Sequence, residues 1–371
     1  MRPLRPDRYL PGMSIPAPPP AHESEMYKTM HRQPADLRRL MEAGWAPAEQ
    51  AADLLVPARR LFLVGIGTSY HAALVGEWLF RGVGLDARTV MSSDFATYSD
   101  LYPLEPDDAV VVLPHSGTKT FSTRSLERAR AEGATVISVG SLTAEHPGSQ
   151  LVLRTVERER SSAFTSSHTA AMFVLAQVAT TLAELKRRTV AADLRRALAV
   201  LPDQIEDVLR RQDEVLGVAR EAAGRLIYVA GAGPNAATAL EAVIKAREAA
   251  TARIDGMSLE QFLHGPLVTV NPEDLAVLVH VRGADPVTAA RTAEIAGVLE
   301  LIGTPLWLVG QPADQAPRAT VFELPEVPEL LSPSWPWYRC RSWPSRWRSS
   351  AGPTLIASGR TTRATTPPCP H

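Results

Sequence analysis

Short apolar runs recur along the chain and alternate with longer segments of helical periodicity. Residues 61–65 and 226–231 are two such runs, and each leads into a Gly-x-Gly turn. Continuous apolar runs of four to seven residues are typical of strands that are buried on both faces, and helical patterns follow them, for example at residues 122–132 and 288–302. The alternation predicts an α/β fold whose parallel sheets are covered by helices on both sides.

The same pattern occurs twice. Gly67 and Gly233 are 166 residues apart, and the apolar runs that begin at Asp107 and Glu273 have the same spacing. A third pair of segments, starting at residues 133 and 303, is 170 residues apart. One large mixed sheet would not explain so constant an offset, so we predict two tandem doubly wound parallel-sheet domains.

The segments that flank these domains differ from them in composition. Apolar residues follow helical spacing before the first domain, with interruptions near Pro34 and Pro47. The predicted organisation is a disordered leader at 1–24, N-terminal helices at 25–55, a first domain at 56–200, a second domain at 205–330 and an aberrant tail at 331–371.

The tail departs from every pattern seen earlier. After Glu329 there is no acidic residue and no lysine, and four of the seven tryptophans lie between Trp335 and Trp347. If Ser is encoded by TCN and Arg by CGN, joining the third base of each codon to the first two of the next gives mostly apolar residues and alanine, which is the composition of a buried helix. We interpret the tail as a shifted reading frame rather than a natural disordered segment, and sequencing the gene tests this.

Charge and cysteine content narrow the class of protein. The 39 lysines and arginines nearly balance 40 aspartates and glutamates, so no net field favours nucleic acid or an anionic membrane. No apolar run is long enough to cross a bilayer, and the proline-rich start does not resemble a signal peptide. The only cysteines are Cys340 and Cys369, outside both predicted domains, which fits a reducing cytoplasm. We expect a soluble cytoplasmic protein that binds a small molecule.

Candidate ligand groups follow the first predicted strand. In doubly wound sheets ligands bind at the carboxyl ends of the strands. The turn at Gly67 presents the hydroxyl groups of Thr68 and Ser69 at the start of a helix, where they suit an anion, a sugar hydroxyl or plain N-capping. A dinucleotide fingerprint is not completed, because Tyr70 stands near the place of its third glycine.

The loop after the strand at residues 107–113 is richer in donors. Ser116, Thr118, Lys119 and Thr120 lie between that strand and the next helix. A phosphate group needs several convergent N–H and O–H donors and the positive end of a helix dipole. The corresponding loop at 281–286 has no hydroxyl group and contains an acid, so we expect one phosphate site per chain, in the first domain.

Two further clusters remain open to more than one interpretation. Residues 161–169 place six hydroxyl groups before a long apolar helix, where Ser166 and Ser167 are either capping groups or ligand contacts. Glu241, Lys245 and Glu248 share one face of a predicted helix, a pattern that usually forms a solvated salt-bridge ladder.

A histidine that directly precedes a rigid Gly-Pro turn favours a functional site near this charged helix. That residue is His264, and core packing is a poor explanation for it at such a position.

These segments resemble the motifs of the SIS (sugar isomerase) domain family, in particular the isomerase domain of glucosamine-6-phosphate synthase and related amino-sugar-phosphate deaminases. The resemblance spans roughly residues 25–330. It is carried by Gly67-Thr-Ser, His115-Ser-Gly-Thr, the helix from Ala239 to Glu248, and Glu260-Gln-Phe-Leu-His-Gly-Pro-Leu.

The resemblance implies a sugar-phosphate substrate and a homodimer. It assigns Glu248 as the base that moves a proton, and His264 as the group that assists ring opening, often in the site of a neighbouring subunit. The implied substrate and phosphate contacts are Gly67, Thr68, Ser69, His115, Ser116, Gly117, Thr118, Thr120, Ser166 and Ser167.

Aldose–ketose interconversion needs one base to move a proton between C1 and C2 through an enediol-like intermediate, so we expect neither a metal nor another cofactor. Lys245 is placed to lower the pKa of the Glu248 carboxyl group or to stabilise a developing oxyanion.

The chain also departs from the family pattern. Lys119 stands where a hydroxyl group is usual, Ser167 and His168 replace a lysine-containing stretch, and the closing C-terminal lysine segment is absent. No cysteine precedes Cys340, so we expect no glutamine-dependent release of ammonia. The predicted function is isomerisation or deamination of an amino-sugar phosphate. The alternatives are deglycation of a phosphorylated sugar-amine and a non-catalytic role as a sugar-phosphate sensor.

Overall fold

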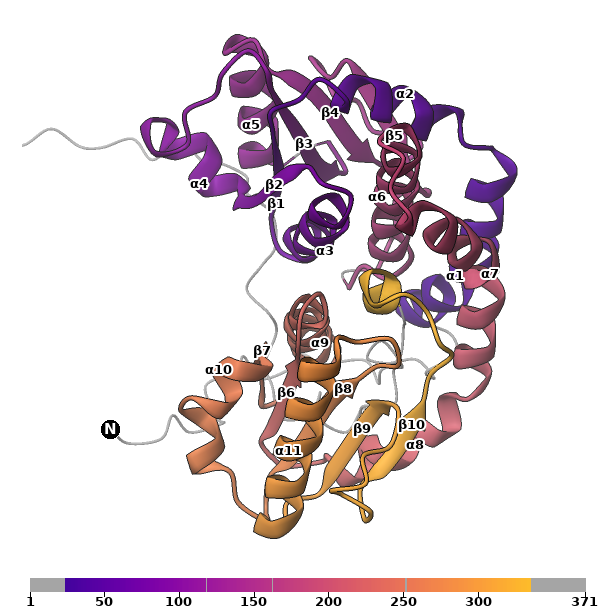
Figure 1. Ribbon diagram of the computed structural model, residues 1–371, viewed down its shortest axis with the longest axis vertical. Helices are drawn as coiled ribbons and strands as arrows, with labels where there is room; N and C mark the ends of the chain where they lie inside the picture. Colours follow the sequence, from indigo (N-terminus) through magenta and orange to yellow (C-terminus); the bar gives the residue numbers. More distant parts are fainter. Residues whose placement is uncertain (1–23, 118, 162, 251, 335–371) are drawn as a thin grey trace, which may run out of the picture.

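The computed structural model of the chain describes residues 24–117, 119–161, 163–250 and 252–334. Figure 1 shows two α/β lobes, one holding β1 to β5 and the other β6 to β10, with α1 and α7 along one side. The predicted leader at 1–24, except Ser24, and the predicted tail beyond Ser334 lie outside the described residues.

The first sheet has five strands, all paired in parallel, in the order β2-β1-β3-β4-β5. Its strands are β1 (Arg60–Gly65), β2 (Asp86–Met91), β3 (Asp108–His115), β4 (Thr135–Gly140) and β5 (Leu151–Arg154). The helices that accompany it are α3 (Thr68–Gly82), α4 (Ser92–Thr97), α5 (Thr120–Ala131) and α6 (Ser166–Leu185), with the short η3 (Ser99–Leu101).

The second sheet is also parallel and has the order β7-β6-β8-β9-β10, which is the same topology counted from its own first strand. Its elements are β6 (Ile227–Gly231), α9 (Asn235–Ala250), β7 (Ile254–Ser258), α10 (Leu259–Leu263), η4 (Pro266–Thr269), β8 (Leu275–His280), α11 (Pro286–Ile302), β9 (Leu306–Gly310) and β10 (Thr320–Glu323). The predicted fold class, two tandem parallel-sheet α/β domains with N-terminal helices, is confirmed.

The alternation of side chains along the strands divides the interior into layers. Leu61 and Leu63 of β1 face one way, while Phe62 and Val64 face the other and pack with α4 and α5. The layer that contains Leu63 also includes Val229 of β6, so one apolar core runs from the first domain into the second. The two domains therefore share a core on their facing sides.

Two N-terminal helices, α1 (Glu25–Glu42) and α2 (Ala46–Leu55), pack on α6, and α1 also packs on α7 (Val190–Arg210). The predicted interruption at Pro34 is wrong, because α1 continues through it. Proline lacks the N–H that would bond to the Met30 carbonyl group. The Gln33 side chain fills that role, since its Nε2 donates to the Met30 oxygen at 2.8 Å. The predicted interruption near Pro47 is present, because α1 ends at Glu42 and Pro47 lies in the first turn of α2.

Two described segments, one made of α7 and α8 and the other of η5, connect the lobes. Helix α7 is continuous across residues 200–205, where a domain boundary was predicted, and α8 (Gln212–Glu221) follows it. The short η5 (Glu329–Ser334) returns to lie against α3, α6 and α9, and Asn235 Nδ2 donates to Ser332 Oγ at 2.8 Å. The first four residues of the predicted tail thus belong to an ordered contact. None of the described helices has the length and apolar character to cross a membrane.

Candidate functional site

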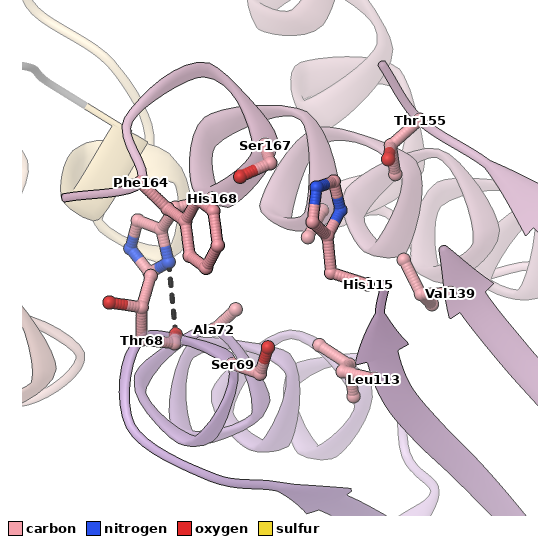
Figure 2. A pocket seen from close by; sticks show the side chains of 11 residues that line it. Thr68, Ser69, Ala72, Leu113, His115, Val139, Thr155, Phe164, Ser167 and His168 are labelled. Carbon is pink, nitrogen blue, oxygen red and sulfur yellow. Dashed lines mark hydrogen bonds between the residues drawn. The ribbon is translucent and has the colours of Figure 1, made fainter. Parts of the chain in front are cut away.

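A small cavity of about 20 Å³ lies at the carboxyl ends of β1, β3 and β4. Figure 2 shows it between the starts of α3 and α6, with His115 entering from the end of β3. Its lining residues are Thr68, Ser69, Ala72, Leu113, His115, Val139, Thr155, Phe164, Ser167, His168 and Ala171. A space of this size holds about one water molecule. A molecule as large as a sugar phosphate does not fit inside the cavity in this conformation.

The Gly-x-Gly turn brings the start of α3 against the end of β1. A Cβ atom on Gly65 would lie 2.4 Å from the Ser69 carbonyl oxygen, and Gly67 has a φ of +58°. Both positions therefore require glycine. Gly67 is itself the N-cap residue, so neither Thr68 nor Ser69 caps this helix. Both residues line the cavity.

The predicted phosphate loop begins at the end of β3. His115, Ser116 and Gly117 are partly buried, and Gly117 has a φ of +70°. A Cβ atom on Gly117 would lie 2.6 Å from the Glu145 carbonyl oxygen, so the turn is closely packed. Thr118 lies outside the described residues, and Thr120 is exposed at the first position of α5.

The starts of the two equivalent helices α5 and α11 differ in how they are capped. Lys119 is the N-cap of α5 and provides no side-chain cap. In the second domain the Asp285 carboxylate accepts hydrogen bonds from Val287 N at 2.9 Å and Thr288 N at 3.4 Å. The chain's own carboxylate thus occupies the anion position at α11, while α5 keeps a start that suits an external anion.

Ser116→Ala is expected to weaken phosphate-sugar binding about fivefold, because a hydroxyl donor to an anion contributes about 1 kcal/mol. Isothermal calorimetry with a sugar phosphate measures the change, and Thr118→Ala should act in the same direction. Thr288→Ala, at the equivalent helix start of the second domain, is the matched control. Unchanged affinity in both first-domain variants would exclude this loop as the phosphate site.

Three of the hydroxyl groups at residues 161–169 bond to side chains of α1. Ser166 Oγ donates to Asp36 Oδ2 at 2.6 Å, and Thr169 Oγ1 donates to Gln33 Oε1 at 2.5 Å. Ser167 alone of the two predicted serines lines the cavity. The buried Glu159 carboxylate caps the helix by accepting from Ser167 N at 2.6 Å. The two serines therefore differ in position: Ser166 joins α6 to α1, whereas Ser167 faces the cavity.

Two histidines, His115 and His146, lie at the predicted phosphate loop. Burial lowers the pKa of His115, and its buried Nε2 has no hydrogen-bond partner among the described residues. Burial, together with the positive charge of Arg154, lowers the pKa of His146 to about 4. His146 Nδ1 lies 2.7 Å from Ser138 Oγ, and its ring fills the space beside Gly140.

The neutral His146 ring makes folding sensitive to acid. Its pKa in the folded chain is below the unfolded value of about 6.5, so its contribution is present above that pH and is lost as the pH falls from about 6.5 toward 4. We expect His146→Asn, which can keep a donor to Ser138, to flatten the fall of the melting temperature over this range. A slope unaltered in His146→Asn would contradict the assignment.

The charged row on α9 is not a solvated ladder. The Glu241 and Lys245 side chains are each 1% exposed, whereas Glu248 is 39% exposed. Lys245 Nζ donates to Glu248 Oε2 at 2.9 Å and to Thr68 Oγ1 at 3.0 Å. Lysine 245 therefore links the Glu248 carboxylate of the second domain to a residue that lines the first-domain cavity.

Sequence reasoning missed two histidines at this contact. His71 Nδ1 lies 2.6 Å from Glu241 Oε2, and His168 Nδ1 lies 3.1 Å from the Thr68 carbonyl oxygen (Figure 2). Burial acts to raise the pKa of Glu241, but the positive charges of His168, Lys245 and His71 outweigh it and hold that pKa well below its usual range. The position of His71, one turn after Gly67, was the only available signal.

The structure does not bring His264 to the cavity. It caps the carboxyl end of α10, its side chain is 72% exposed, and its Nε2 lies 3.6 Å from Glu260 Oε2. Within residues 24–334 as described, no group of three or more histidine, cysteine or acidic side chains is arranged to hold a metal ion.

Comparison with known proteins finds similarity to one family domain and to curated relatives. Residues 54–181 match the SIS domain. The glutamine–fructose-6-phosphate aminotransferase (isomerizing) of Pyrobaculum aerophilum is 28% identical over 320 residues, which cover 83% of this chain and 52% of that protein. The chain thus spans about half the length of this curated relative.

Solved structures show the same fold. The C-terminal domain of glucosamine-fructose-6-phosphate aminotransferase from Francisella tularensis superposes with a TM-score of 0.77 at 18% identity, covering 87% of this chain and 95% of that one. A glucosamine-6-phosphate deaminase from Thermotoga maritima gives a TM-score of 0.65 at 17% identity, covering 86% of this chain and 92% of that one.

Proposed function

Because the chain contains a SIS domain and is homologous to the isomerase domain of glutamine–fructose-6-phosphate aminotransferase, we propose that it binds an amino-sugar phosphate and isomerises or deaminates it. Glucosamine-6-phosphate and fructose-6-phosphate are the substrates to test first. Free ammonia or water, rather than glutamine, is the second reactant in this proposal.

The observation that carries the proposal is the position of Glu248. Its carboxylate is partly exposed and accepts from Lys245 Nζ, which also donates to Thr68, a residue that lines the cavity. The start of α5 and the loop after β3 lie at the same carboxyl edge of the first sheet. In this proposal, a sugar whose phosphate group is bound at that loop extends toward Glu248 of the second domain, which acts as the base.

The proposed reaction needs a proton to move between C1 and C2 of the open-chain sugar. Glu248 takes this proton and returns it to the neighbouring carbon, through an enediol-like intermediate. The ammonium group of Lys245, which is removed from water, stabilises negative charge that develops on the adjacent oxygen. Its burial makes this electrostatic contribution larger than it would be at a solvated surface.

The exposure of His264 supports a site shared between two copies of the chain. A histidine that is 72% exposed on α10 is available to a second molecule. We propose a homodimer in which this side chain assists ring opening in the site of the other copy. Deglycation of a phosphorylated sugar-amine uses the same base, and a non-catalytic sensor would use the same phosphate loop without turnover.

Turnover of the purified chain tests the proposal. If the reaction is a deamination, glucosamine-6-phosphate and water should give fructose-6-phosphate and ammonia. If it is an isomerisation, fructose-6-phosphate should give an aldose-6-phosphate without release of ammonia. Isothermal calorimetry with the same two compounds measures binding in parallel. Binding without turnover of either compound would favour the sensor, and absence of both binding and turnover would overturn the proposed substrate class.

A further inference from the structure

Two buried ionisable groups at the contact between the domains have no role in the proposed proton transfer. His71 on α3 is 7% exposed, and Glu241 on α9 is fully buried. Helices α3 and α9 pack directly on each other, so this pair joins the first domain to the second. A buried carboxylate is costly unless it is paired and hydrogen-bonded, so the arrangement around Glu241 requires an explanation.

The two oxygens of Glu241 have different partners. Oε2 lies 2.6 Å from His71 Nδ1, the length of a strong charge-assisted hydrogen bond. Oε1 accepts from Thr68 Oγ1 at 3.2 Å, and Lys245 Nζ lies 3.4 Å from it. His71 thus provides the closest contact of this carboxylate, and Lys245 makes the longest of the three.

Lys245 therefore makes its two shortest contacts with residues other than Glu241. Its Nζ lies 2.9 Å from Glu248 Oε2 and 3.0 Å from Thr68 Oγ1. The Thr68 hydroxyl group accepts from Lys245 and donates to Glu241, so its orientation is set from both sides. If His71 did not satisfy Oε2, the Glu241 carboxylate would compete with Glu248 for the one ammonium group within reach.

We propose that His71 and Glu241 are positioning residues, which hold Lys245 between Thr68 and Glu248 and so place the base at the cavity. This inference rests on the proposed function of Glu248. The imidazole group of His71 and the carboxylate of Glu241, which meet across the domain contact, determine the direction of the buried Lys245 ammonium group.

Three positively charged or titratable side chains face Glu241, one from each of the packed helices. They are His71 from α3, His168 from α6 and Lys245 from α9 itself, and together they keep Glu241 ionised. His168 also contacts the Thr68 carbonyl oxygen at 3.1 Å, so it supports the same turn of α3. An ionised Glu241 attracts Lys245 whenever one of its other partners is lost.

Two variants of His71 separate positioning from general stability. His71→Asn places an amide donor near the Nδ1 position, whereas His71→Gln places it near the Nε2 position and leaves Glu241 Oε2 without its partner. We expect His71→Gln to lower kcat about tenfold or more with KM within about twofold, because a misplacement near 1 Å in a catalytic group has effects of this order. His71→Asn should restore kcat to within about threefold.

A matched control measures the effect of replacing a buried histidine that does not contact Glu241. His280 is buried in the second domain and lies 3.1 Å from Gln311 Nε2 through its Nε2, apart from the Glu241 cluster. His280→Gln should lower the melting temperature without changing kcat. Equal kcat in His71→Gln and wild type, or an equal loss in His71→Asn and His71→Gln, would overturn the positioning role.

A crystal structure of His71→Gln provides a readout that is independent of turnover. We expect Lys245 Nζ to lie nearer to Glu241 than to Glu248, the reverse of the present distances of 3.4 and 2.9 Å. If the wild-type chain proves inactive, the proposed function fails while this measurement still decides on the positioning of Lys245. An unmoved Lys245 would overturn the inference whatever the activity.

Discussion

Glu248→Gln is expected to reduce turnover by about 10²-fold or more while ligand affinity changes little. The amide keeps the shape of the side chain and its contact with Lys245, but it no longer accepts a proton. Because Glu248 is 39% exposed, its loss as an ion-pair partner should cost less than about 1 kcal/mol of stability. Steady-state kinetics and thermal unfolding together measure both effects.

The control for this variant is an ion-paired carboxylate away from the cavity. Glu184 lies 2.6 Å from Arg195 at the surface, so Glu184→Gln should leave turnover unchanged. We propose to repeat the measurement in a chain whose tail, residues 331–371, is replaced by the product of the alternative reading frame. Turnover of Glu248→Gln near the wild-type value would end the isomerase mechanism proposed for this chain.

Lys245→Met is expected to lower the free energy of unfolding by about 3 kcal/mol. Removing one partner of a buried ion pair leaves the other charge desolvated and unpaired, which costs about 3 to 5 kcal/mol. The lower end applies because His71 and Thr68 still donate to Glu241. Urea denaturation measures the change, and turnover should fall as well, because the charge next to Glu248 is lost.

Lys28 offers a matched control for this stability effect. It forms an i,i+3 ion pair with Glu25 at 2.9 Å, the same spacing and distance as Lys245 with Glu248, but both partners are largely exposed. Lys28→Met should therefore cost less than about 0.5 kcal/mol. A similarly small loss in Lys245→Met would show that burial of the α9 cluster adds little to stability.

Local patterns in the sequence were sufficient to predict the elements and their arrangement in two sheets. The strand that leads into Gly67, the equivalent strand before Gly233 and the helix at residues 235–250 all form as expected. Apolar periodicity reports on the faces that an element buries, and paired glycines mark the close approach of helix to strand. Pro34 is the exception, because the Gln33 side chain substitutes for the missing backbone donor.

Charge spacing placed Glu241, Lys245 and Glu248 on one side of α9, but it did not predict that two of them are buried. That depends on α3, whose His71 and Thr68 are 170 and 173 residues away from Glu241 along the chain. Likewise, a run of hydroxyl groups did not separate Ser166, which bonds to Asp36, from Ser167 at the cavity. Periodicity determines which side chains share a face, and only tertiary packing decides what that face meets, because the partners come from distant segments.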